Sequence, residues 1–193
     1  MEVLFHFVFQ LFKIGILSLV YYSIIMLILI VIQKVNPNLF LNQLKSKKKK
    51  YRPYLFATCY LLLLIFSFTY WGNHGLGDNP KIPIGHWKTL KNTNWTEYAY
   101  LDSHKTSEGI HIETTQFKVT DDKLCGNLKS WFYDFRNNFF ILDLKTDELI
   151  EFQSETEYNQ YATKNQLPKS SELLNFEENY KAHWSGIRFW LLP

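Results

Sequence analysis

Cysteine is scarce in this sequence, with only Cys59 and Cys125 in 193 residues. Two isolated cysteines are too few for a disulfide framework or for a zinc site with paired ligands. A bridge between them is not expected, because Cys59 lies in an apolar run typical of a membrane span and Cys125 lies in the C-terminal region. The sequence therefore excludes the disulfide-rich class and leaves the redox compartment open.

Catalytic and ligand-binding motifs are missing as well. The string WGNHGLGD at 71–78 places glycines beside His74 and Asp78, but its spacing fits neither a dinucleotide fingerprint nor a P-loop. We interpret it as a flexible joint and keep His74, Asp78 and the later His86 only as weak candidates for a ligand loop. No Gly-x-Ser-x-Gly element occurs, and the six histidines lack metal-ligand spacing. The sequence predicts no catalytic residue, no metal and no cofactor.

Acidic residues are absent between Lys34 and Arg52, where seven basic residues occur. Six of the seven form a dense cluster: Lys45, Lys47, Lys48, Lys49, Lys50 and Arg52. Residues 72–193 carry 13 basic and 17 acidic side chains, so this part lacks the basic surface that nucleic-acid binding requires. The sequence therefore argues against a nucleic-acid partner.

Two runs contain no charged residue. Residues 14–33 and 54–71 each have about the 18–20 residues that cross a hydrocarbon core as a helix, and tyrosine and tryptophan flank the second run. The first run exceeds the apolar region of a cleavable signal peptide, and no small-residue cleavage site follows it. We predict two transmembrane helices. Residues 3–12 either extend the first helix or lie along the membrane interface.

The basic loop at 34–53 predicts the orientation, because basic residues in short loops stay cytoplasmic. Residues 1–71 would then form a transmembrane helical hairpin whose loop is cytoplasmic. The N-terminus and the C-terminal domain would both lie in a periplasm or extracellular space. The loop would also attract anionic lipid headgroups, by about 1 kcal/mol per basic residue near the surface.

Residues 72–193 are expected to fold as one aromatic-rich α+β soluble domain. About five mostly antiparallel strands are predicted, at 95–101, 109–119, 128–135, 139–144 and 148–153. Ser154 and Glu157 form a predicted capping box for a first helix, and a second helix begins near Ser171 with an aromatic stripe that ends at Trp184. The apolar tail at 187–193 is expected to pack back on the protein, for instance as an edge strand.

The predicted function is binding rather than catalysis. We expect a small integral membrane protein that presents a noncatalytic α+β domain to another protein or an envelope component, or that acts as an accessory subunit. Its expected partners are the lipid bilayer and either a protein or a second copy of the chain.

An alternative function is suggested by the order of the predicted elements along the chain. Two N-terminal spans followed by a β-rich domain resemble the two-span β-barrel effectors of bacterial antiphage signalling. That resemblance implies a ligand-gated effector whose domain is cytoplasmic, binds a cyclic nucleotide and then clusters in the membrane. No motif extends it to particular residues, and the basic loop would have to lie outside. A hydrolase built from scattered residues is a third alternative.

Overall fold

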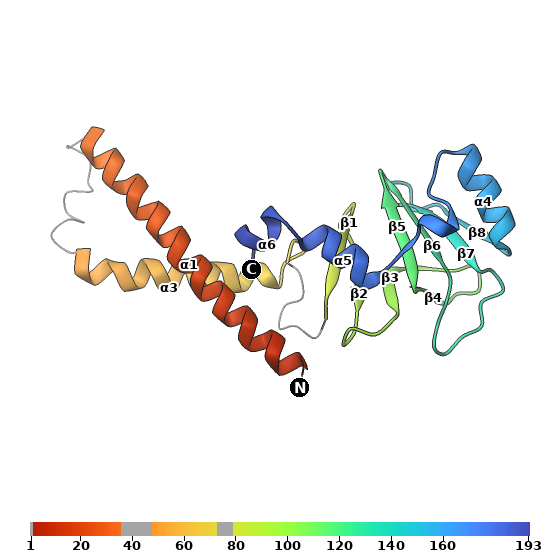
Figure 1. Cartoon of the computed structure of the whole chain (residues 1–193), viewed down its shortest axis with the longest axis horizontal. Helices are drawn as coiled ribbons and strands as arrows, with labels where there is room; N and C mark the ends of the chain where they lie inside the picture. Colours follow the sequence, from red (N-terminus) through yellow and green to blue (C-terminus); the bar gives the residue numbers. More distant parts are fainter. Residues whose placement is uncertain (1, 36–47, 73–78) are drawn as a thin grey trace. The chain divides into compact units, whose positions relative to one another are not determined.

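The computed structural model describes residues 2–35, 48–72 and 79–193 of the chain (Figure 1). The chain divides into two compact units. The first, here called the helical unit, comprises residues 1–72 and 186–193, and the second, here called the head, comprises residues 73–185. Helices together with two antiparallel sheets make this an α+β protein, as predicted.

Among its described residues, the helical unit contains one helix that is long and apolar enough to cross a membrane. Helix α1 spans Glu2–Val35, so residues 3–12 continue the first helix, and its apolar stretch covers Phe7–Val35. Helix α3 spans Lys48–Ser67, but its apolar stretch, Tyr51–Ser67, is shorter. The structure therefore confirms one candidate span, whereas the second predicted span is not confirmed.

Helices α1 and α3 pack against each other and cross (Figure 1). On α1 the buried residues recur at helical spacing, at Gln10, Ile14, Leu17 and Ser18. Gln10 Nε2 donates to the buried Ser67 Oγ on α3 at 3.3 Å. Small and polar side chains of this kind allow close approach and hydrogen bonding between helices in apolar surroundings.

The head contains two antiparallel sheets. The first sheet has the order β1-β2-β3-β4, with β1 Lys81–Gly85, β2 Lys88–Asn92, β3 Ala99–Lys105 and β4 His111–Thr114. The second has the order β8-β7-β6-β5-β9, with β5 Gln116–Thr120, β6 Lys123–Asn127, β7 Phe139–Asp143, β8 Leu149–Phe152 and β9 Leu174–Asn175.

Successive residues of the strands point to opposite faces of the sheet and so contribute to two separate hydrophobic cores. The larger core combines residues of both sheets with Phe176, for example Leu90 and Ile112 from the first sheet and Phe117 and Phe140 from the second. A smaller core lies between the second sheet and helix α4. Because both faces of β7 are covered, its sequence FFILD is apolar almost throughout.

Asn127, the last residue of β6, forms hydrogen bonds with the residues at the corner where the chain passes from β4 to β5. Its Oδ1 accepts hydrogen bonds from Thr114 Oγ1 at 2.9 Å, from the Thr115 amide at 3.0 Å and from the Gln116 amide at 2.9 Å. Its Nδ2 donates to Thr115 Oγ1 at 2.7 Å. Asn127 and Thr114 are both buried, so one side chain satisfies the polar groups of the corner.

Helix α4, Glu155–Lys164, begins at the predicted cap. The Glu157 amide donates to Ser154 Oγ at 3.3 Å, while the Glu157 carboxylate accepts from the Gln153 amide instead of from Ser154. Tyr158 and Ala162 are fully buried in the smaller core. The Tyr158 hydroxyl donates to the Pro168 carbonyl at 2.6 Å and so holds the chain that follows the helix.

Helix α5, Phe176–Trp184, starts later than predicted. A short 3-10 turn, η1 (Ser170–Glu172), precedes it, and β9 then pairs with β5, Leu174 opposite Phe117. The cap is Asn175, whose side chain accepts from the Glu178 amide at 2.9 Å, while the Glu178 carboxylate accepts from the Asn175 amide at 3.1 Å.

Several strand predictions were wrong in their limits. No strand was predicted where the head has β1, β2 and β6, and the two acids that precede β6, Asp121 and Asp122, lie in a turn. The 95–101 strand begins only at Ala99, because Asn94 and Trp95 have positive φ. The 109–119 strand divides at Thr115, the corner that Asn127 holds. Segments 139–144 and 148–153 correspond to β7 and β8, as predicted.

Two further predictions need correction. Residues 128–135 form a loop and not a strand: Leu128 and Phe135 contact the larger core, whereas the rings of Trp131, Phe132 and Tyr133 between them remain exposed. The tail forms helix α6, Ile187–Leu191, within the helical unit, and not an edge strand of the head. It follows Gly186, whose φ of 63° and ψ of −133° suit glycine.

Candidate functional site

Hairpin turns of both sheets are joined by polar contacts between side chains. In the β1–β2 turn, His86 Nε2 lies 2.8 Å from Asp122 Oδ1 of the β5–β6 turn. At the start of β2, Lys88 Nζ lies 2.7 Å from Asp147 Oδ1 and donates to the Leu144 carbonyl at 2.6 Å. His104 Nε2 of β3 contacts the same Asp147 oxygen at 3.1 Å. These contacts hold the two sheets together.

The carboxylates of the β7–β8 turn are kept ionised by their partners. The hydrogen bond from Lys88 lowers the pKa of Asp147. The pKa of Asp143 is lowered in the same way, first by Lys123 and then by the Thr146 amide. Asp147 thus connects its turn to the first sheet, whereas Asp143 pairs with Lys123 on the neighbouring strand β6. In the part of the chain that the structure describes, no group of three or more His, Cys, Asp or Glu side chains could hold a metal ion.

Cys125 is a core residue and not an activated thiol. It is fully buried in the smaller core with Tyr158. Burial raises the pKa of its thiol to about 11, so the thiol is protonated at neutral pH.

Of the weak ligand-loop candidates, only His86 is described, and its partner is Asp122. His74 and Asp78 lie outside the described residues, as do Lys45 and Lys47 of the basic loop. Lys48, Lys49 and Lys50 form the start of α3, and Arg52 of the same helix is exposed.

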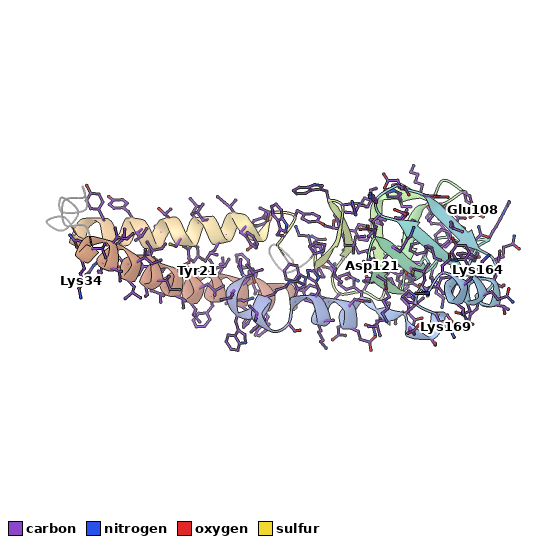
Figure 2. The ribbon with its side chains drawn as sticks, turned by 90° about the horizontal axis from the view of Figure 1, so that it is seen from above. Tyr21, Lys34, Glu108, Asp121, Lys164 and Lys169 are labelled. Carbon is purple, nitrogen blue, oxygen red and sulfur yellow. The ribbon has the colours of Figure 1, made fainter. Side chains whose placement is uncertain are left out.

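Two grooves occur on the second-sheet side of the head. One, of about 540 Å³, has a mostly polar lining: Gln116, Asn127, Leu128, Lys129, Asn138, Phe139, Glu155, Ser170, Ser171 and Leu173. The other, of about 640 Å³ and here called the α4 groove, is lined by Thr156, Asn159, Gln160, Thr163, Lys164 and Lys169. Figure 2 shows Lys164 and Lys169 at this side of the head. The α4 groove thus combines two cationic groups with four uncharged polar ones.

Three consecutive exposed aromatic side chains of the head lie in the loop from β6 to β7, residues 128–138, here called the aromatic loop; Trp87 of the β1–β2 turn, 73% exposed, stands apart from them in the sequence. Trp131, Phe132 and Tyr133 are 69%, 85% and 53% exposed. Apolar surface of this size is unfavourable in water, and consecutive exposed aromatic residues are typical of binding surfaces. The aromatic loop is therefore the candidate binding surface of the head.

The aromatic loop is fixed at both ends. The Leu128 amide donates to the Asn138 carbonyl at 2.8 Å, and the Asn138 amide donates to the Phe152 carbonyl at 2.8 Å. Phe135, within the loop, packs against the larger core. The Trp131 ring lies with its centroid 5.5 Å from that of Tyr98. Anchoring lowers the entropy that these side chains would lose on binding a partner.

Sequence reasoning missed this surface because it assigned 128–135 to a strand. One signal was present. Trp131, Phe132 and Tyr133 are consecutive, whereas a half-buried strand alternates apolar and polar residues.

Comparison of the chain with protein-family models, with curated proteins and with solved structures finds no match. The functional proposal therefore rests on the chain's own geometry.

Proposed function

We propose that the chain is a two-span membrane protein whose noncatalytic head binds another protein through the aromatic loop. The observation that carries this proposal is the exposure of Trp131, Phe132 and Tyr133 on a loop whose ends are anchored. Arg136 adds an exposed guanidinium, with Nε 3.3 Å from Glu108. Tryptophan, tyrosine and arginine are the residue types that contribute most to protein interfaces.

The proposed second span is α3 with the turn that follows it. Its uncharged residues, 54–67, extend about 21 Å as a helix, and the turn at 68–71 adds further length toward the roughly 30 Å of a hydrocarbon core. Beyond Ser67 the backbone stays internally paired, since the amides of Phe68, Thr69 and Gly72 donate to carbonyls three residues earlier. Such pairing is required where water is absent.

Hydroxyl groups of both helices are also satisfied locally. Ser18, Ser23 and Thr58 each donate to the carbonyl four residues earlier, at 2.7–2.9 Å. Large apolar side chains such as Leu27, Leu61 and Leu62 remain 55–63% exposed. A bilayer would cover these side chains, and the local hydroxyl bonds leave few polar groups to desolvate.

The proposed orientation follows from the basic loop, which stays cytoplasmic while the head lies in the periplasm or extracellular space. The partner proposed for the head is therefore another envelope or surface protein.

A photo-reactive amino acid at position 132 tests the proposed binding surface in intact cells. We expect a discrete protein cross-link that disappears in the W131S/Y133S background. Gln160 on α4 is the control position, because it is exposed and lies outside the aromatic loop. No cross-link at 132, the same pattern at 160, or only phospholipid adducts at 132 would contradict the proposal.

A second candidate function is the ligand-gated effector implied by the layout resemblance. Two observations favour it: the β-rich head of nine strands in its described residues, and the α4 groove with Lys164 and Lys169. Lysines beside polar side chains suit a phosphate-bearing ligand such as a cyclic nucleotide.

Thermal unfolding of the full chain in detergent tests this second function with a panel of cyclic mononucleotides and dinucleotides. A ligand at 100 times its dissociation constant stabilises by about 2.7 kcal/mol, a readily measured shift. We expect K164E/K169E to abolish the shift and K145E, an exposed lysine of the β7–β8 turn, to preserve it. A panel without any shift would reject this function.

A further inference from the structure

The apolar C-terminal tail is held against the first helix. Within the helical unit, the Tyr21 hydroxyl donates to the Leu191 carbonyl at 2.5 Å. Lys13 Nζ lies 4.5 Å from the centroid of the Phe189 ring, a cation–π contact. Helix α6 is thus held to α1 at two points, through its middle residue, Phe189, and through its last residue, Leu191.

The contacts with Lys13 and Tyr21 show which part of α1, and so of the proposed span, α6 lies beside. Lys13 and Tyr21 are eight residues apart, which corresponds to about 12 Å along a helix axis. The first uncharged run begins at residue 14, directly after Lys13. Helix α6 therefore lies beside the outermost part of the span. Interfacial helices bury their apolar side to a similar depth, about 5–10 Å into the boundary between headgroups and acyl chains.

The outward side of α6 has the chemistry of that boundary. Ile187 and Trp190 are 75% and 73% exposed, and Phe189 and Leu191 are also partly exposed. Arg188 is the one charged residue of the helix, and arginine and tryptophan both suit the headgroup level. In water this surface would be unfavourable. It also continues the exposed apolar surface of α1, such as Ile16 and Val20.

We propose that α6 is a third membrane-contacting element, which inserts Ile187 and Trp190 into the phospholipid interface of the leaflet where α1 enters the bilayer. This inference rests on the proposed membrane span of α1. It makes the head a domain tethered to the membrane at both of its ends, by the chain that follows α3 and by the chain that follows α5. Neither the two-span layout nor the aromatic loop requires this second attachment.

Photo-cross-linking in phosphatidylcholine/phosphatidylglycerol vesicles tests the proposal with the full chain. A photo-reactive amino acid is placed at 190, at 28 on the exposed apolar side of α1, or at 160 on α4. All three positions are exposed, so folding should be preserved at each. Lipid adducts are measured by mass spectrometry. We expect adduct yields at 190 comparable to those at 28 and several-fold above those at 160.

The three positions separate the failure of this inference from the failure of the proposed span. Adducts at 28 but only background at 190 would overturn membrane contact by α6 and leave the span intact. Background yields at both 28 and 190 would reject the span and, with it, this inference. Equal yields at 190 and 160 would also overturn the contact.

Discussion

Replacement of Asn127 by alanine tests how the two sheets are joined. The substitution removes the acceptor shared by Thr114 Oγ1 and the amides of Thr115 and Gln116, and one hydrogen bond that Asn127 donates. Four hydrogen bonds at a net value of about 1 kcal/mol each give an upper limit of about 4 kcal/mol. Because Gln116 is exposed, water can replace part of this loss, and we expect about 3 kcal/mol.

Asn127→Asp is the matched control. Its carboxylate keeps an acceptor for the same three donors, and the Thr115 hydroxyl can donate to the second oxygen. We expect this variant to lose less than about 1 kcal/mol. The assay is urea unfolding of the full chain in detergent, followed by tryptophan fluorescence. Equal destabilisation by alanine and aspartate would refute the argument, because the cost would then not come from the lost acceptor.

Three further predictions concern the Asp147 ion pair, the Ser154 helix cap and the chain after Gly186. Because the pKa of Asp147 is lowered in the folded protein, its carboxylate stabilises the fold above about pH 4, the usual unfolded pKa. This stabilisation is lost as the pH falls toward the folded pKa. The D147N variant has no such carboxylate, so its stability should fall less than that of the wild type in acid unfolding curves. S154A should cost about 1 kcal/mol in urea unfolding, through loss of the α4 cap. G186A should strain the backbone by about 1–3 kcal/mol and speed carboxypeptidase digestion of the tail.

Each of these variants has a control. Lys88→Met should destabilise the head more than D147N at neutral pH, because it removes both the ion pair with Asp147 and the hydrogen bond to the carbonyl of the buried Leu144. Asparagine at 147 keeps an amide oxygen that can accept from Lys88, and the bond to Leu144 is retained. The reverse order would contradict this account. S171A, at an exposed serine, should have no effect comparable to S154A. Digestion of G186A no faster than that of G15A, a change within α1, would be inconsistent with strain at Gly186.

Local chemistry made part of the fold predictable. Ser154 marks the start of α4 because its side chain caps the amide of Glu157, only three residues further along the chain. Strands β7 and β8 were predictable because an apolar run and an alternating run flank a short polar turn. The long first helix was predictable because an uncharged run of this length rarely has another explanation.

The remaining features depend on contacts between distant parts of the chain. Nothing near Asn127 in the sequence indicates that it ends β6 and fixes the β4–β5 corner. Residues 174–175 could have continued a helix, but their pairing with β5 moves the start of α5 to Phe176. The aromatic loop was missed because the exposure of a ring is decided by whether a core lies beside it, which a local pattern does not reveal.

The location of the head tests the central proposal most directly. In intact cells, cysteines introduced at 160 in the head and at 47 in the basic loop can be labelled with a membrane-impermeant maleimide. Cys59 and Cys125 are buried, and we expect them to contribute little background. The proposal predicts labelling at 160 in intact cells and labelling at 47 only after the membrane is permeabilised. Labelling at 47 in intact cells, with 160 protected until permeabilisation, would contradict the proposed orientation and favour the cytoplasmic, ligand-gated head.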